Sequence, residues 1–255
     1  MDTLFIGQKI IELHTVDSTN SYAIELLKKE SLPEGTLIWS KNQTSGRGQR
    51  GNKWDSEPFK NGTFSIILKP SFLPVDEQFY LNKIVSLAVA DFVSDILKNT
   101  HPNNTVAIKW PNDIYVGDKK LAGILIENSL RNNHINNSVI GIGININQTQ
   151  FNSNVQNPIS LKLICENDFN IENCIAELCS YFEARYLQLK SNHLEKINKE
   201  YEKKLYRYGE WANFSIGEKV FKARITGISK EGMLIIETPD AKKHDYGFKE
   251  IASVI

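Results

Sequence analysis

Apolar positions along the chain recur with two different periods, and each predicts a different kind of element. In residues 76–98 and 171–190 they recur at steps of three and four, which predicts helices with one buried face. Residues 123–126 form a continuous apolar run, which predicts a strand covered on both faces. The full set of predicted strands is 9–13, 36–40, 63–69, 106–109, 113–116, 119–127 and 139–147, and further helices are predicted after the polar cap 18–20 and at 194–205.

From about Trp211 the pattern changes to short strands separated by turns. Such a region of about 45 residues predicts a small β-barrel. We therefore expect two domains, 1–208 and 209–255, with the candidate site in the first. The predicted strands of the second domain are 217–228, 233–237, 244–248 and 251–254, and residues 148–158 of the first have the composition of a mobile loop.

Composition and charge exclude several classes of protein. The chain has 30 basic and 30 acidic side chains, which argues against a nucleic-acid partner. Its three cysteines are odd in number and lack paired metal-ligand spacing, so we expect reduced, buried or partly buried thiols. No run approaches the roughly 20 apolar residues that span a bilayer, and no signal peptide is visible. We expect a soluble, cytoplasmic protein with no membrane partner.

The segment from Thr44 to Trp54 has the composition of an anion-binding loop. Residues 46–54 hold three glycines, two arginines and a lysine, and glycine lets backbone N–H groups approach a ligand while arginine suits carboxylates and phosphates. The glycine spacing matches G-x-G-x-x-G, but a strand and not a helix follows it at 63–69, so we reject a dinucleotide-binding unit. The alternative for an isolated loop of this kind is a solvated turn.

Four further segments combine polar side chains in ways that each have a simple structural explanation. Asp17-Ser18-Thr19-Asn20 is a good helix cap, Lys120 fits a solvated hairpin lysine, and Trp110 fits core packing. Considered together with the glycine-rich loop, however, the segments 17–20, 109–113, 120–127 and 141–147 closely resemble the biotin–protein ligases in order and spacing. Lys-Trp-Pro-Asn-Asp and Gly-Arg-Gly-x-Arg-Gly are specific as a pair, and the resemblance covers about Leu13 to Ile255.

The resemblance implies an α+β fold and an ATP-dependent reaction. The fold is a mixed β-sheet packed with helices, akin to class II aminoacyl-tRNA synthetases, plus an SH3-like C-terminal barrel. Such enzymes join biotin to AMP with release of pyrophosphate, and then transfer biotin to one lysine of a biotin carboxyl carrier protein. ATP and biotin are the implied substrates, Mg²⁺ the implied metal, and a homodimer is compatible with the family.

The resemblance also assigns roles to residues of this sequence. Lys120, Arg47 and Asp113 are the implied catalytic residues, with Asp113 also facing Mg²⁺. The implied biotin-binding residues are Ser18, Thr19, Gln43, Gly46, Arg47, Lys120, Gly123 and Gly141. The implied ATP- and adenylate-binding residues are Arg50, Trp54, Lys109, Asn112, Asp113 and Asn145, although a strand-end turn is the alternative for Asn145.

Two departures from the family pattern concern the loop and the N-terminus. Many members carry arginine where this chain has Gln49, and the catalytic pattern begins almost at once, without the helix-turn-helix domain of bifunctional members. We therefore expect the monofunctional form. The competing readings are a lipoate–protein ligase, which shares the fold, and a biotin-sensing regulatory protein. The glycine-rich loop together with Lys109–Asp113 favours the biotin branch.

Overall fold

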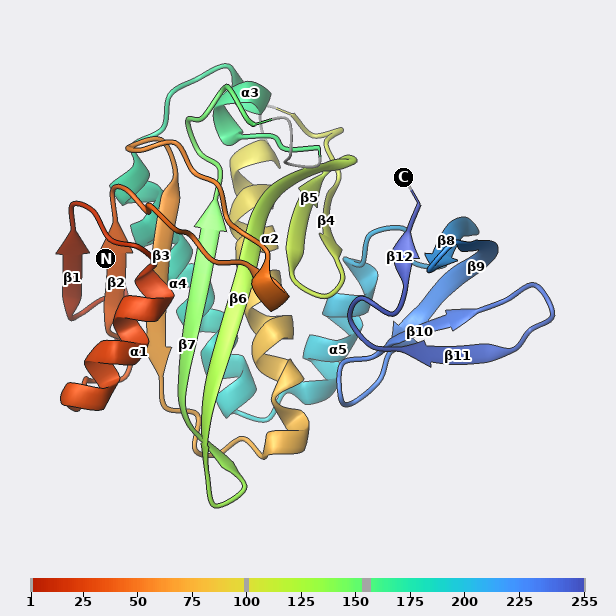
Figure 1. Ribbon diagram of the computed structural model, residues 1–255, viewed down its shortest axis with the longest axis horizontal. Coiled ribbons are helices and arrows are strands. Elements are labelled where there is room, and N and C mark those ends of the chain that lie inside the picture. The colour runs from red at the N-terminus through yellow and green to blue at the C-terminus, as the bar shows by residue number, and fades with distance from the viewer. Residues whose placement is uncertain (1, 99–100, 153–156, 255) are drawn as a thin grey trace.

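The computed structural model describes residues 2–98, 101–152 and 157–254, with the side chain of Arg50 excepted. Its larger part is a seven-stranded sheet in which the first two strands run parallel and all other neighbours antiparallel (Figure 1). The sheet is therefore mixed, as the resemblance implied. Its strands, in spatial order, are β1 (Ile10–Leu13), β2 (Leu37–Ser40), β3 (Gly62–Leu68), β7 (His134–Ile144), β6 (Lys119–Arg131), β5 (Asp113–Val116) and β4 (Val106–Lys109).

Helices cover the two faces of this sheet unequally. The long helices α2 (Phe79–Lys98) and α4 (Ile171–Lys190) pack on one face, with α5 (Leu194–Lys203) against α2. The other face carries α1 (Thr19–Lys29), which packs on β2, β3 and β7 (Figure 1). Of the described α-helices, α1 thus covers the part of this second face that β2, β3 and β7 form. The short elements η1 (Gln49–Gly51), η2 (Val75–Glu77) and α3 (Leu161–Cys165) lie in the connections.

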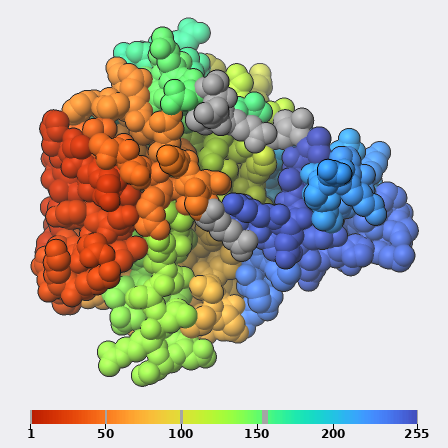
Figure 2. All heavy atoms as spheres, viewed as in Figure 1, coloured from red at the N-terminus to blue at the C-terminus, as the bar shows by residue number. Residues whose placement is uncertain are grey.

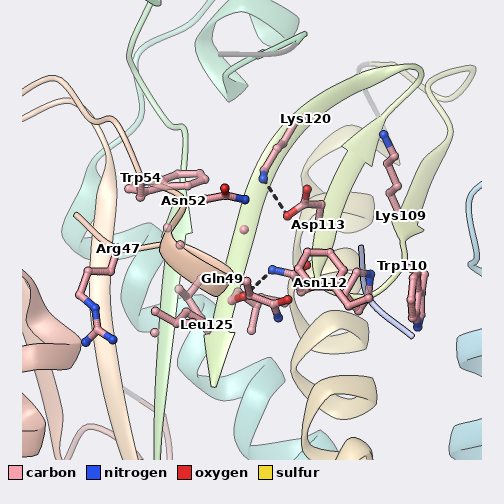
Figure 3. Close-up of a pocket in the computed structure, with 18 of the residues that line it drawn as sticks. Arg47, Gln49, Asn52, Trp54, Lys109, Trp110, Asn112, Asp113, Lys120 and Leu125 are labelled. Atoms are coloured by element: carbon pink, nitrogen blue, oxygen red, sulfur yellow. Dashed lines mark hydrogen bonds and ion pairs between the residues drawn. The ribbon is translucent and has the colours of Figure 1, made fainter. Parts of the chain in front are cut away.

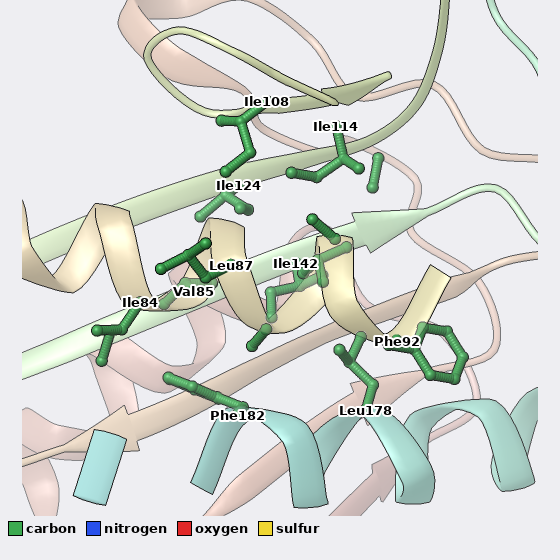
Figure 4. Packing of buried hydrophobic residues seen from close by; sticks show 14 of the residues in the cluster. Ile84, Val85, Leu87, Phe92, Ile108, Ile114, Ile124, Ile142, Leu178 and Phe182 are labelled. Carbon is green, nitrogen blue, oxygen red and sulfur yellow. The ribbon is translucent and has the colours of Figure 1, made fainter. Parts of the chain in front are cut away.

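Strand β7 shows how the sequence separates the two faces. Its run Ile140-Gly141-Ile142-Gly143-Ile144 alternates large apolar side chains with glycine, and successive side chains of a strand point to opposite faces. The isoleucines join the core between the sheet, α2 and α4, together with Ile124, Phe92 and Phe182 (Figure 4). The glycines leave a hollow on the opposite face.

A second, antiparallel sheet forms the C-terminal part of the molecule, to the side of the first (Figure 1). Its order is β11 (Lys243–Tyr246), β10 (Leu234–Glu237), β9 (Lys219–Ile228), β8 (Ala212–Ile216) and β12 (Ala252–Ser253). Trp110 ties the two parts together: its indole Nε1 donates to the carbonyl of Gly232 at 2.9 Å. Trp110 is also partly buried and packs against the core cluster, whose members come from both sheets, in agreement with its predicted packing role.

The observed elements differ from the predicted ones mainly at a 3₁₀ turn and where strand pairing continues through polar residues. The predicted helix at 76–98 is split, because residues 75–77 form a 3₁₀ turn after Pro74 and α2 begins only at Phe79. Strands β6 and β7 extend as a ribbon through the mostly polar residues 128–138, where most side chains are exposed but Ile135 and Ser138 are buried. The short elements α3 and β8 were not predicted, because elements this short show no periodic pattern of apolar positions. The predicted mobile loop at 148–158 lies partly outside the described residues.

The cysteines and membrane-spanning helices were also subjects of sequence-based expectations. Cys174 and Cys179 are free thiols and are buried, and Cys165 is partly buried, as predicted. Burial raises the pKa of Cys174 to about 11 and that of Cys179 to about 12, so both stay protonated thiols. Among the described residues, no helix has the length and apolarity needed to cross a bilayer.

A buried lysine lies between α2 and α5. Lys83 Nζ donates to Oδ1 of Asn198 at 2.8 Å and lies 4.8 Å from the centroid of the Tyr80 ring. Burial lowers the pKa of Lys83 to about 8, against an opposing effect of Glu202. The unfolded chain, with its ordinary lysine pKa of about 10.4, thus binds more protons than the folded protein above about pH 8. This group alone therefore makes the free energy of unfolding rise with pH over that window.

Replacing Lys83 by methionine is expected to remove this rise. The difference in free energy of unfolding between wild type and Lys83→Met should shift in favour of the wild type as the pH rises from about 7 to about 10. Urea denaturation at several pH values measures it. Lys98→Met, on the last turn of the same helix, is the matched control. A difference that stays constant with pH for Lys83→Met would contradict the assignment.

Candidate active site

The hollow on the free face of the sheet is built by strand register. Asp113 of β5 pairs with Gly123 of β6, Gly123 pairs with Gly143 of β7, and Gly143 pairs with Thr63 of β3. Four neighbouring strands thus place a carboxylate, two glycines and a threonine in one row. The next row holds Leu125, Gly141 and Ser65. Because three of these positions lack a side chain, a ligand can approach the backbone of the sheet.

The indole of Trp54 lies across this row. A Cβ atom on Gly143 would come within 2.6 Å of Trp54 Nε1, and one on Gly123 within 3.0 Å of Cζ3. Side chains at either position would therefore collide with the ring. Trp54 Nε1 is buried and has no hydrogen-bond partner among the described residues. A buried N–H without an acceptor is costly, so this end of the hollow offers a donor to a ligand.

The N-terminus of α1 forms the wall beside the hollow. Ser18 is the N-cap, and its Oγ accepts from the backbone N–H of Ser21. Gln43 Oε1 accepts from the backbone N–H of Thr19 at 2.8 Å and from Thr19 Oγ1 at 3.1 Å. Asn20 lies directly over Gly141, where a Cβ atom would come within 2.9 Å of its Cγ. The helix cap and the ligand-facing wall are therefore the same residues.

Charged side chains stand at the other end of the hollow. Lys120 Nζ forms an ion pair with Asp113 Oδ1 at 2.7 Å and lies 5.8 Å from the centroid of the Trp54 ring (Figure 3). Lys109 Nζ donates to the hydroxyl of Tyr115 at 3.2 Å. Burial lowers the pKa of Lys109 against the opposing effect of Asp113, and the positive charges of Lys120 and Arg207 act in the same direction as burial. An added anion would relieve this crowding of cations.

The segment Lys109–Asp113 combines structural and site roles. Asn112 Nδ2 donates to the carbonyl of Ile124 at 2.6 Å, and the backbone N–H of Ile124 donates to the carbonyl of Asn112 at 3.0 Å. Asn112 therefore fixes the strand that carries Gly123, and it can still offer its Oδ1 and its second amide N–H to a ligand. These bonds hold Asp113 in register beside Gly123, where its carboxylate faces the cavity.

The side chain of Arg47 does not point toward Lys120 and Asp113. Figure 3 shows its guanidinium directed away from them, and Nη2 pairs with Glu127 Oε1 at 2.6 Å while Nη1 donates to Ser21 Oγ at 3.2 Å. The loop around it is ordered by backbone bonds, including Gly48 N–H to Asn52 O at 2.7 Å and Trp54 N–H to Gly46 O at 2.9 Å. Arg47 still lines the cavity, at its rim.

A cavity of about 570 Å³ joins these groups. Figure 2 shows the glycine-rich segment, in orange, next to the C-terminal part of the chain, in blue, on one face of the molecule. Phe214, Ile225 and Ile251 of the C-terminal sheet and its connections line the cavity from that side. Among its described lining residues the basic ones are Arg47, Lys53, Lys109, Lys120, Arg207 and Lys249, and the acidic one is Asp113. A chain of zero net charge thus concentrates positive charge at this site.

The structure brings most of the predicted site residues together, with three exceptions. Gly46 and Asn145 are not among the described residues that line the cavity. The carbonyl of Gly46 accepts from the backbone N–H of Trp54 at 2.9 Å, and Asn145 Nδ2 donates to the carbonyl of Ile159 at 3.0 Å, which ties the end of β7 to the following loop. The side chain of Arg50 lies outside what the structure describes. The cavity-lining predicted residues are Ser18, Thr19, Gln43, Arg47, Trp54, Lys109, Asn112, Asp113, Lys120, Gly123 and Gly141.

Sequence reasoning missed two cations of the cavity, Arg207 and Lys249. Arg207 follows α5 and its Nη2 lies 3.8 Å from Asp118 Oδ1, while Lys249 precedes β12. Both residues have positive φ, 57° and 73°. Neither belongs to a motif: pairing of the segment after α5 with Ile108 of β4 brings Arg207 to the site, and the docking of the C-terminal sheet brings Lys249 there. No local signal in the sequence could have found them.

The donor set fits a magnesium ion that enters with a nucleotide. Mg²⁺ is commonly held by one or two carboxylates together with phosphate oxygens and water. Asp113 supplies one carboxylate at the cavity, and the described residues contain no group of three or more His, Cys, Asp or Glu side chains that could hold a metal ion. Asp113 would thus face a Mg²⁺ ion whose other ligands come from the substrate.

Known proteins share both the sequence pattern and the fold. The Bacillus subtilis bifunctional ligase/repressor BirA is 28% identical over 249 residues, which cover 96% of this chain and 74% of that protein. The Paracoccus denitrificans biotin–[acetyl-CoA-carboxylase] ligase is 31% identical over 134 residues, 52% of this chain and 53% of that one. The Aquifex aeolicus biotin protein ligase, solved in complex with biotin and ATP, matches with a TM-score of 0.78 and 25% identity, covering 97% and 99% of the two chains.

The cavity combines a glycine-lined stretch of sheet with a group of cations, an arrangement that suits a small ligand beside an anion. The chain belongs to the biotin/lipoate A/B protein ligase family, whose model matches residues 13–145, more than half of its length. The catalytic fold expected from the resemblance is thereby confirmed.

Proposed function

We propose that this protein is an ATP-dependent biotin–protein ligase. The observation that carries the proposal is the glycine hollow of Gly123 and Gly143, closed at one end by the Lys120–Asp113 pair and surrounded by cations. Biotin would lie in the hollow with its carboxylate toward Lys120, and ATP would lie beside it, between the two sheets. The relatives named above as biotin ligases support the choice of biotin.

In the first half-reaction a biotin carboxylate oxygen attacks the α-phosphorus of ATP, which forms biotinyl-AMP and releases pyrophosphate. Two anions must approach each other, so the step depends on positioning and charge neutralisation. Lys120 would neutralise the carboxylate and the α-phosphate, and Lys109, Arg207 and Lys249 add positive charge for the remaining phosphates. Mg²⁺ bound to the phosphates would supply further neutralisation beside Asp113.

In the second half-reaction the amine of an acceptor lysine attacks the acyl carbon of biotinyl-AMP. A C–N bond forms, the C–O bond to AMP breaks, and the amine loses one proton. Asp113 is the one acidic side chain among the described lining residues, so it would orient the incoming amine. The acceptor would be a biotin carboxyl carrier domain. We also propose that residues 1–208 and 209–255 are separate domains, with the site at their junction.

The experiment that tests the function is a biotinylation reaction. The protein is incubated with MgATP, biotin and a biotin carboxyl carrier domain, and mass spectrometry of the carrier reads the result. One biotinyl group should appear on one lysine, and a carrier with that lysine replaced by arginine should stay unmodified. A carrier that gains no biotin, in a reaction where a known biotin ligase modifies it, would contradict the proposal.

Lipoate is the competing substrate, because the family includes lipoate ligases. Calorimetry with biotin and then with lipoate separates the two. We expect binding of biotin with no competition by an equal concentration of lipoate, since the polar wall of Thr19, Gln43 and Asn20 suits the amide-like ring of biotin. Tighter binding of lipoate would favour the other branch of the family.

A further inference from the structure

Glu127 links two walls of the site without lining the cavity itself. Its Oε1 pairs with Arg47 Nη2 at 2.6 Å, and its Oε2 accepts from Asn20 Nδ2 at 2.9 Å. Arg47 belongs to the glycine-rich loop and Asn20 to α1, and both line the cavity. One carboxylate thus connects the loop to the wall of the hollow.

The bond to Asn20 fixes the floor of the hollow. Asn20 Oδ1 accepts from Ser65 Oγ at 2.6 Å, and its Nδ2 also reaches the carbonyl of Leu125 at 3.2 Å. Its amide group lies against Gly141, in a space that a methyl group would fill. All of these contacts persist if Arg47 leaves, so Glu127 stays hydrogen-bonded when it loses its cation.

The ion pair with Glu127 engages the guanidinium of Arg47, which is the group that a ligand carboxylate would also bind. Glu127 offers the guanidinium a carboxylate, which is the same chemical group that ends the biotin side chain. The side chains of Arg47 and Glu127 are 43% and 27% exposed, so water screens the pair and it can open. To leave Glu127, Arg47 would change its conformation within the Gly46–Trp54 loop.

We propose that Glu127 is a positioning residue that holds Arg47 away from the reacting groups in the free protein, and that Arg47 exchanges this internal carboxylate for the carboxylate of the ligand. The proposal rests on the proposed biotin-binding function. Glu127 competes with the anionic end of the ligand and not with its ring. It therefore sets how strongly the site prefers an anionic ligand over a neutral one of the same shape.

The test compares biotin with biotinol, its neutral alcohol, by calorimetry on wild type and Glu127→Gln. Glutamine keeps an acceptor for Asn20 and removes the charge that binds Arg47. Biotin should bind the variant about two- to fivefold more tightly, the fold-change expected for a partly exposed ion pair, and biotinol should bind both proteins equally. Glu25→Gln, which breaks an exposed pair with Lys28 on α1, should change neither affinity.

A double variant tests whether the effect of Glu127→Gln acts through Arg47 or only through the loss of a negative charge near the ligand. In an Arg47→Gln background, Glu127→Gln should no longer change the affinity for biotin, because the exchange acts through Arg47. Equal tightening in both backgrounds, or weaker binding of both ligands with a lower unfolding temperature, would overturn the proposal. So would an unchanged affinity for biotin. If the wild type bound no biotin, the proposed function would fail together with the role of Glu127. If the wild type bound biotin and Glu127→Gln left its affinity unchanged, only the role of Glu127 would fail.

Discussion

Lys120→Ala is expected to slow the formation of biotinyl-AMP by about 10²–10³-fold, the usual effect of removing one preorganised partner of a developing charge. Lys120 Nζ lies at the end of the glycine hollow, paired with Asp113 at 2.7 Å and beside the Trp54 ring. Negative charge is most crowded there while the carboxylate attacks the α-phosphorus. Transfer of biotin from supplied biotinyl-AMP should fall less, because the anhydride already exists and the other cations remain.

Asp113→Asn serves as the companion change, because it removes charge with little change of shape. It should slow both half-reactions: the first through the metal that enters with ATP, and the second through the orientation of the acceptor amine. Asparagine keeps the strand pairing with Gly123, so the fold should persist. The two variants therefore separate the roles of the two partners in one ion pair.

Single-turnover kinetics of each half-reaction, measured separately, decide these roles. Pyrophosphate release reads the first, and labelling of the carrier by supplied biotinyl-AMP reads the second. Lys119→Ala is the matched control, since Lys119 is the exposed neighbour of Lys120 and is not among the described lining residues. Intact adenylation in Lys120→Ala, or full transfer activity in Asp113→Asn, would show that the roles are assigned wrongly.

Gly143→Ala is expected to weaken biotin binding strongly. The new methyl group would overlap the ring of Trp54, coming within 2.6 Å of Nε1, and would push that ring from the row of glycines toward the space that the ligand needs. Overpacking of a buried site typically costs about 1–3 kcal/mol. If the whole cost falls on the bound state, the dissociation constant for biotin rises by about 5- to 150-fold.

Calorimetry with biotin measures this effect, and thermal unfolding shows how much of the cost falls on the free protein instead. Gly227→Ala is the matched control, because Gly227 is also a strand glycine and its added Cβ would meet its nearest neighbour, Glu202, only at 3.6 Å. The control should keep both affinity and stability. Wild-type affinity and wild-type unfolding temperature in Gly143→Ala would show that Trp54 moves aside freely and that the hollow is not the binding surface.

Much of the site could be predicted from local sequence, because its residues lie in short runs at the ends of regular elements. The cap Ser18-Thr19-Asn20, the strand glycines Gly123 and Gly141, and the pair Asp113 and Lys120 all lie at the cavity. The helical periods at 171–190 and 194–205 predicted α4 and α5 closely. For Asn145 the sequence left two roles open, since a polar residue at a strand end serves a ligand and a turn equally well; its Nδ2 donates to the following loop, and its role toward a ligand stays a prediction.

The sequence by itself determined the alternation of β7, the composition of the glycine-rich loop and the family of the chain. These follow from side-chain periods and from residue types, which are local properties. Only the tertiary structure decided that Arg47 pairs with Glu127 and that Arg207 and Lys249 reach the cavity. Arg47 and Glu127 are 80 positions apart in the chain, and Arg207 is brought to the site by the pairing of its segment with β4 while Lys249 comes from the second sheet's connections. Such neighbours meet only when packing fixes register and docking, and no local pattern encodes these distances.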